Sequence, residues 1–441
     1  MRLILLLGLF IATITALELP STWGSSMVVE ADVPNKLWGV DVAGSSIAVS
    51  AFGASYNATA DSSGAWSVMI AAQGKSTTPV TITVYSSSGG SLSLTDVLVG
   101  YTVVCSGQSN MQLTVGATYD YVTETADADT LGTTLRIFQV AMLDSYSGVT
   151  TPQLNLTASI PWTRASAASI VPMSALCYYF GAALVKKHPD TPIGLLASSW
   201  GGTAIQPWMS PPSLASCGAL NPAPTHEELA ASPDPSLAML GRLLLHSRAR
   251  SGLAAFPTNG SCLYNAMIYP LMQNPKRMLA WYQGESNVGD PVGYQCLMPA
   301  MIRDWREKWA AVGSSPSTPF FFVQLSAWPT QDSPYIPIFR VAVENALALP
   351  NVGMVVSADL SDPAGALHPI HPMWKKELGR RAALWADNVV FGNASSPTSG
   401  PRLVSAVWDW WSPSWANYHF QVPPFSAHLI SLKRIGLRRC V

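Results

Sequence analysis

The sequence predicts an α/β protein with a parallel sheet, preceded by a small all-β region. From about residue 27 to 98, apolar and polar residues alternate between turn signals such as Asp61-Ser62-Ser63-Gly64, which is typical of half-buried strands. From Tyr101 onward, short apolar runs alternate with helical patterns, as they do in a parallel sheet flanked by helices. The strands expected in that sheet are Tyr101–Cys105, Ile193–Ala197, Met278–Tyr282, Phe320–Leu325 and Val352–Ala358.

The length favours two domains, since 441 residues exceed the roughly 250–300 at which a single core stops growing. Met1-Arg2, an apolar run and small residues up to Ala16 have the features of a signal peptide. No later stretch reaches the ~20 apolar residues of a membrane span, so we expect a soluble product, secreted or lysosomal. We expect a signal peptide over 1–16, a β domain over 25–98, an α/β domain over 99–400 with an inserted loop region over 210–262, and a tail over 401–441.

Composition narrows the possible partners. Charged residues make up 12% of the chain and the formal net charge is -1, which argues against the basic patch that nucleic-acid binding needs. The 16 Trp and 14 Tyr fit either core packing or walls that stack on sugar rings. The oligomeric state stays open. Four N-glycosylation sequons support the secretory route, and they begin at Asn57, Asn155, Asn259 and Asn393.

The six cysteines lie far apart with no C-x-x-C spacing, which argues against a zinc or redox site and favours disulfides. Cys217 and Cys262 flank a stretch rich in Pro, Ser and Ala, where a bridge would restrict the unfolded chain. Cys105 lies in an apolar strand pattern, where a buried free thiol is also reasonable.

Polar or Gly-rich turns follow four of the expected strands, at the carboxyl ends where open α/β sheets bind ligands. They are segments 106–110, 198–203, 283–287 and 359–371. A serine attacks an ester only when a base removes its proton and donors stabilise the oxyanion. These segments contain a candidate for each role: Ser109 as nucleophile, His371 as base, and the N–H of Gly201 or Gly202 and the Asn287 amide as donors. Each of these residue types is also common in ordinary turns and caps.

Taken together, the segments resemble the sialate O-acetylesterase family of the SGNH hydrolase superfamily. The similarity extends from about Val28 to Arg381 and rests on CSGQSNM (105–111), WGGT (200–203), QGESN (283–287) and IHP (370–372), with further matches at 263–268 and 304–306. It implies a flavodoxin-like three-layer α/β/α hydrolase domain that hydrolyses O-acetyl esters of sialic acid through an acyl-enzyme, without metal or cofactor. It further implies that Ser109, Gly201, Gly202 and Asn287 supply the oxyanion hole, with Gln108, Gln283 and Glu285 as candidates for the substrate pocket.

The sequence departs from the family pattern at two places. Family members generally carry an acid shortly before the catalytic histidine, whereas here the nearest acids are Asp362, our choice, and Asp359. A backbone carbonyl in that role would leave a Ser–His dyad, and His368 is an alternative base to His371. The tail from about Leu403 does not resemble the closing segment of the family.

Three functions therefore remain open. The first is hydrolysis of O-acetylated sialic acid, and the second is the same chemistry on another acetylated polysaccharide such as xylan. The third, of a different class, is a catalytically inactive carbohydrate-binding protein, which the displaced acid and the aromatic content would allow.

Overall fold

The computed structural model describes residues 17–218, 226–233, 257–326, 335–360 and 370–400, the strands 402–408 and 416–421, and positions 238, 241, 242 and 245. The expected signal peptide, Asp362 and His368 lie outside the described residues.

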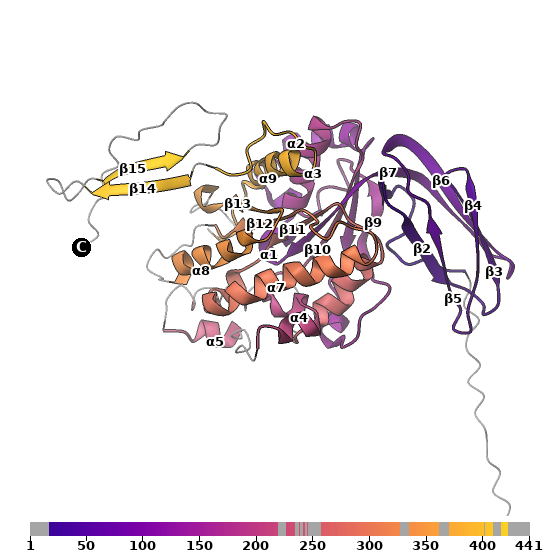
Figure 1. The fold of residues 1–441 in the computed structure, drawn as a ribbon, viewed down its shortest axis with the longest axis horizontal. Helices are drawn as coiled ribbons and strands as arrows, with labels where there is room; N and C mark the ends of the chain where they lie inside the picture. Colours follow the sequence, from indigo (N-terminus) through magenta and orange to yellow (C-terminus); the bar gives the residue numbers. More distant parts are fainter. Residues whose placement is uncertain are drawn as a thin grey trace, which may run out of the picture.

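Most strands of the N-terminal part pair antiparallel (Figure 1); the exception is β1, which pairs parallel with β7 (Ser91–Gly107). β2 pairs with β5, and β3 pairs with both β4 and β6. In β3 and β5 every second residue is buried, as the alternating sequence pattern predicted. The strands are β1 (Val28–Glu30), β2 (Asn35–Val40), β3 (Ser46–Ala51), β4 (Ala54–Thr59), β5 (Ala65–Ile70) and β6 (Ser76–Ser86).

One long strand, β7 (Ser91–Gly107), joins this part to the α/β part. Its first half pairs antiparallel with β6, and its second half lies parallel between β10 and β11. The strand continues through residue 98, where the sequence suggested a domain boundary, so the two parts share a strand.

The sheet of the α/β part has the order β13-β12-β11-β7-β10-β8-β9. All of these pairs are parallel except β8 with β9. The predicted α/β class with a parallel sheet is confirmed, and each expected strand forms; β8 and β9 were not expected. The strands are β8 (Leu135–Val140), β9 (Ala158–Arg164), β10 (Ile193–Ser199), β11 (Met278–Tyr282), β12 (Phe320–Gln324) and β13 (Val352–Val356).

Helices cover both faces of this sheet (Figure 1). α3 packs against α9 on one side, and α7 packs against α8 on the other. The helices are α1 (Ser109–Gln112), α2 (Tyr121–Leu131), α3 (Ala175–Lys187), α4 (Pro211–Ala215), α5 (His226–Ala230), α7 (Pro291–Ala310), α8 (Tyr335–Val343) and α9 (Lys375–Val389). Short helical turns are η1 (Val115–Ala117), η2 (Asp144–Gly148), η3 (Gln206–Trp208), η4 (Tyr264–Ile268), η5 (Tyr269–Gln273), η6 (Glu285–Asn287), η7 (Glu344–Ala348) and η8 (Ala358–Leu360).

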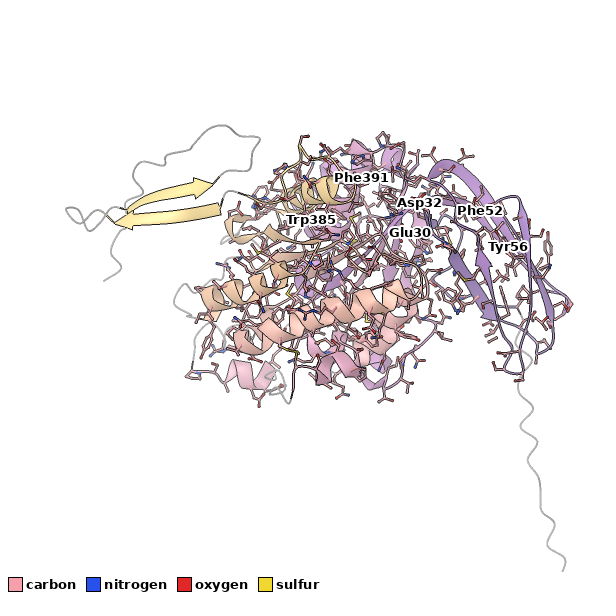
Figure 2. The ribbon with its side chains drawn as sticks, viewed as in Figure 1. Glu30, Asp32, Phe52, Tyr56, Trp385 and Phe391 are labelled. Carbon is pink, nitrogen blue, oxygen red and sulfur yellow. A yellow bond between two sulfur atoms is a disulfide. The ribbon has the colours of Figure 1, made fainter. Side chains whose placement is uncertain are left out.

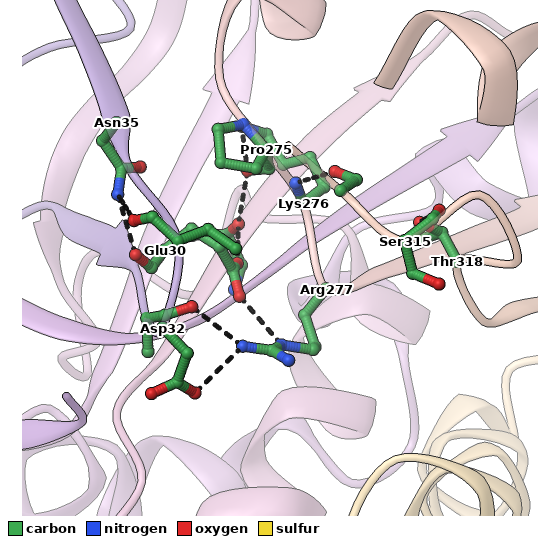
Figure 3. A network of polar contacts seen from close by, with 12 residues as sticks. Glu30, Asp32, Asn35, Pro275, Lys276, Arg277, Ser315 and Thr318 are labelled. Carbon is green, nitrogen blue, oxygen red and sulfur yellow. Dashed lines mark hydrogen bonds and ion pairs between the residues drawn. The ribbon is translucent and has the colours of Figure 1, made fainter. Parts of the chain in front are cut away.

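An ion pair between buried Glu30 and partly exposed Arg277 links the N-terminal part to the sheet. Glu30, in β1, lies at the junction, whereas Phe52 and Tyr56 lie farther out on the β part (Figure 2). The Glu30 carboxylate accepts a hydrogen bond from Arg277 Nε at 2.9 Å (Figure 3). It also accepts one from the backbone N–H of Thr102 at 2.8 Å. Burial raises the pKa of Glu30, and the Arg277 charge opposes that shift. The junction therefore depends on a buried carboxyl group whose charged form Arg277 stabilises.

Two disulfides correct the cysteine expectations. Cys105 is bonded to Cys177, so it is not a free thiol, and this bridge ties β7 to α3. Cys217 is bonded to Cys296 rather than to Cys262, which is free and buried. The sequence could not give these pairs, because partners 72 and 79 residues apart meet only once the layers are packed.

The described part of the tail is a pair of antiparallel strands, β14 (Arg402–Trp408) and β15 (Ala416–Gln421). No helix within the described ranges is long and apolar enough to cross a membrane.

Candidate active site

Ser109 stands at the sharp turn where β7 ends and α1 begins. Gly107 has φ 141°, and a Cβ at this position would lie 2.1 Å from the backbone oxygen of Tyr282 in β11. Only glycine allows the two chains to come this close. The turn leaves Ser109 half-buried, while its neighbours Gln108 and Asn110 are completely buried.

His371 lies against this serine from the opposite end of the sequence. Its Nε2 is 2.8 Å from Ser109 Oγ, a hydrogen-bond distance across 262 positions of the chain. His371 is half-buried and precedes α9, whose first residue is Lys375. The pair has the geometry required of a nucleophile and its base.

Asn110 connects the nucleophile turn to the histidine segment. Its Nδ2 donates to the backbone carbonyl of Ile370 at 2.7 Å and to Glu285 Oε1 at 2.5 Å. Its Oδ1 accepts from Lys375 Nζ at 2.6 Å. The buried Asn110 amide therefore bonds Ile370 before His371 and Lys375 after it, and links both to the turn that carries Ser109.

The two ionisable partners of Asn110 are themselves buried. Lys375 is fully enclosed, with its Nζ 4.9 Å from the centre of the Tyr282 ring, and burial lowers the pKa of its ammonium to about 7. Burial raises the pKa of Glu285, while the hydrogen bond from Asn110 and the charge of Lys375 oppose that shift. Glu285 Oε2 is buried with no hydrogen-bond partner among the described residues. The desolvation of Glu285 is therefore only partly compensated, at a position close to the Ser–His pair.

Gly201 follows β10 and lies next to Ser109. A Cβ on Gly201 would be 3.3 Å from Ser109 Cβ. The Gly201 N–H donates to Gln112 Oε1 at 2.6 Å. The neighbouring Gly202 is buried and has φ 76°. The structure therefore brings the first glycine of the pair to the nucleophile, with its N–H already bonded to a side chain of α1.

Asn287 belongs to a buried layer of side-chain amides. Its Oδ1 accepts from Gln283 Nε2 at 2.8 Å and from the Ile205 N–H at 2.9 Å, and its Nδ2 donates to Gln206 Oε1 at 3.1 Å. Gln283 Nε2 also donates to Gln108 Oε1 at 3.1 Å, which links this layer to the nucleophile turn.

The three pocket candidates lie within these networks. Gln108, Gln283 and Glu285 have exposed fractions of 0%, 2% and 2%. Their burial favours support of the turn over the contact with substrate expected from the sequence.

Of the acids considered for the histidine, Asp359 is the one within the described residues. Both of its carboxylate oxygens pair with Arg381, at 2.7 and 2.6 Å. This hydrogen bonding lowers the pKa of Asp359. Its carboxylate is thus held by Arg381, which leaves Asp362 as the acid still to be tested.

Three residues around Ser109 received no role from the sequence: Asn110, Lys375 and Gln112. For Gln112 a signal was present, because a residue three positions after the nucleophile lies on the same helical face. For Asn110 and Lys375 the signal was weaker, since only packing shows that both are buried. Within the described ranges, no cluster of three or more His, Cys, Asp or Glu side chains is placed to hold a metal ion.

Comparisons with known proteins agree with the fold and the motifs. A family model described as carbohydrate esterase, sialic acid-specific acetylesterase, matches residues 243–386. Sialate O-acetylesterase of Mus musculus is 33% identical over 339 residues, which cover 69% of this chain and 59% of the mouse protein. The Homo sapiens protein is 31% identical over 335 residues, which cover 69% of this chain and 56% of that protein. The match thus spans less than two thirds of these relatives.

A solved structure extends the likeness over most of the chain. The crystal structure of a carbohydrate acetylesterase from Xanthomonas citri has a TM-score of 0.73 and 29% identity, covering 93% of this chain and 82% of that chain. The chain therefore has the α/β fold, with its largely parallel sheet, of that carbohydrate acetylesterase. The resemblance to the sialate O-acetylesterase family, drawn from the sequence motifs, is confirmed.

Proposed function

We propose that the protein is a serine esterase that removes O-acetyl groups from a sugar, with Ser109 as nucleophile and His371 as general base. The observation that carries this proposal is the 2.8 Å contact between Ser109 Oγ and His371 Nε2 at the carboxyl end of the central strand. Sheets of this class bind their ligands at this edge.

In the first step, Ser109 Oγ attacks the acetyl carbonyl carbon while His371 Nε2 accepts the hydroxyl proton. The carbonyl oxygen becomes an oxyanion, which the N–H of Ser109, a glycine N–H of the 201–202 pair and the Asn287 amide would stabilise. When this intermediate collapses, the C–O bond to the sugar breaks and His371 returns the proton to the leaving oxygen.

In the second step, water attacks the acetyl-serine and His371 takes a proton from it. Collapse of the second intermediate returns a proton to Ser109 Oγ and releases acetate. We assign Asp362 to orient His371, because Asp359 is paired with Arg381. A Ser–His dyad is the alternative when neither acid is used.

O-acetylated sialic acid is the proposed substrate, on the likeness to the sialate O-acetylesterases of mouse and human. Acetylated polysaccharides such as xylan are the second candidate, favoured by the structural likeness to a carbohydrate acetylesterase. A panel of O-acetylated sialosides and acetylated xylan, assayed for acetate release, separates the two. Release from neither, with no turnover of a chromogenic acetyl ester, would leave the inactive carbohydrate-binding protein.

We further propose that the protein passes through the secretory pathway. The two disulfides support this, because disulfides persist in oxidising compartments. Asn57, Asn155 and Asn259 are exposed, whereas Asn393 is half-buried. Asn259 and Asn393 donate their Nδ2 to Ser147 O and to Asp387 Oδ2, at 3.0 and 2.8 Å. Peptide mapping of the secreted protein before and after glycosidase treatment tests all four sites.

A further inference from the structure

The Gln112 side chain accepts a hydrogen bond from the Gly201 N–H, one of the donors proposed to stabilise the oxyanion. It is the last residue of α1 and lies one helical turn after Ser109, on the same side of the helix. Its Oε1 accepts the Gly201 N–H at 2.6 Å, and a Cβ on Gly201 would lie 2.7 Å from that oxygen. The amide oxygen is thus fitted against the glycine that borders the nucleophile.

The side chain that makes this contact is weakly held. Gln112 is half-buried, and the bond to Gly201 is the one hydrogen bond of its side chain within the described residues. This contrasts with Asn110, two positions earlier, whose side chain makes three bonds while fully buried. Gln112 can therefore leave its position for the loss of a single neutral hydrogen bond, worth about 0.5–1.5 kcal/mol net.

A glutamine amide oxygen also matches the ester oxygen chemically. Both are neutral sp² carbonyl acceptors, so exchange of one for the other at the Gly201 N–H changes little in the ground state. An oxyanion accepts a charge-assisted bond that is roughly twice as strong. The exchange therefore favours the transition state over the bound substrate, which is the differential binding that catalysis requires.

We propose that Gln112 is a displaceable stand-in for the substrate carbonyl, which keeps the Gly201 N–H directed at the oxyanion position and leaves when an ester binds. This inference rests on the proposed esterase function. It makes Gln112 a determinant of KM, because every substrate must compete with it, whereas kcat is set after it has left.

Two variants test the inference. Gln112→Ala removes the competitor, and we expect KM for a chromogenic acetyl ester to fall about threefold or more, with kcat within twofold of wild type. Gln112→Glu keeps the shape and offers a stronger, charged acceptor, so KM should rise severalfold at pH 7. Relative to wild type at each pH, that increase should shrink as the pH falls toward the ordinary glutamate pKa of about 4.3. Gln153→Ala is the matched control with unchanged KM, because this exposed side chain bonds Thr151 alone among the described residues.

The opposite pattern would overturn the inference. If kcat falls in Gln112→Ala but stays at the wild-type value in Gln112→Glu, Gln112 is a fixed support of the Gly201 backbone. Thermal melts of both variants show whether they are folded. A wild-type protein that neither releases acetate nor accepts a fluorophosphonate at Ser109 would remove the proposed function and the inference with it, whereas an active wild type confines any failure to Gln112.

Discussion

Asn110 donates a hydrogen bond to the backbone carbonyl of Ile370 at 2.7 Å, which fixes the residue before His371 to the residue after Ser109. The orientation of the histidine is therefore set from the nucleophile turn as well as from its own loop. Glu285 and Lys375 hold the Asn110 amide from both ends, so its own rotation is restricted.

Replacement of Asn110 by Ala should lower kcat for an acetyl ester by about 10- to 100-fold, or roughly 1.4–2.7 kcal/mol of barrier. The reason is that the Ile370 segment loses its anchor while every reacting atom remains. KM should change little, because Asn110 is completely buried and does not contact substrate. A folded Asn110→Ala protein with the kcat of wild type would show that the anchor does not position His371.

Burial of Lys375 should make the free energy of unfolding increase with pH over a defined pH range. Its pKa is lowered to about 7, so between about pH 7 and 10.4 the native state binds fewer protons than the unfolded chain. The free energy of unfolding of wild type should therefore rise with pH relative to Lys375→Met, by up to about 1.4 kcal/mol per pH unit. The groups that face its ammonium are the Glu285 carboxyl, the Tyr282 ring and the Asn110 amide.

Urea unfolding of both proteins at several pH values from 7 to 10 measures this difference. Loss of the bond to Asn110 lowers the unfolding free energy of Lys375→Met by the same amount at every pH. The difference in slope between the two plots of unfolding free energy against pH therefore measures the titration of Lys375. Parallel curves would mean that Lys375 stays protonated in the native state throughout.

Removal of Arg277 should destabilise the junction between the β part and the sheet. Arg277→Ala removes the ion pair of the buried Glu30 carboxylate and leaves Lys276 as the nearby positive charge; we expect a loss of about 2–3 kcal/mol in unfolding free energy. This is below the about 3–5 kcal/mol of a fully enclosed pair, because Arg277 is 29% exposed. Arg380→Ala, which breaks an exposed pair with Glu377, is the control and should cost under about 1 kcal/mol. Equal losses in the two variants would contradict the role of Glu30.

The sequence predicted the central strands because buried parallel strands appear as continuous apolar runs, as in Phe320–Gln324. It did not predict β8, since Arg136 and Gln139 interrupt the apolar pattern; Arg136 is buried and paired with Asp96 from another strand. It did not predict β9 because Pro161 breaks the run, which an edge strand tolerates.

At the site, the motifs predicted which segments meet, because the ends of parallel strands share one edge of the sheet. They did not predict which side chains are buried. The family resemblance implied that Gln283 and Glu285 line the substrate pocket, yet both are buried. Gln283 bonds Gln108 and Asn287, and Glu285 bonds Asn110. The bond from Gly201 to Gln112 depends on a rotamer, which no spacing in the sequence specifies.

The most direct test of the central claim is the site of covalent labelling by a fluorophosphonate, located by peptide mass spectrometry on the wild-type protein. We expect the label on Ser109, its loss together with acetate release in Ser109→Ala, and a strongly slowed labelling rate in His371→Ala, since nucleophile and base act as one unit. Ser109→Ala removes a single half-exposed hydroxyl, so this variant should keep the melting temperature of wild type. A label on another serine, or acetate release at the wild-type rate by folded Ser109→Ala, would contradict the account.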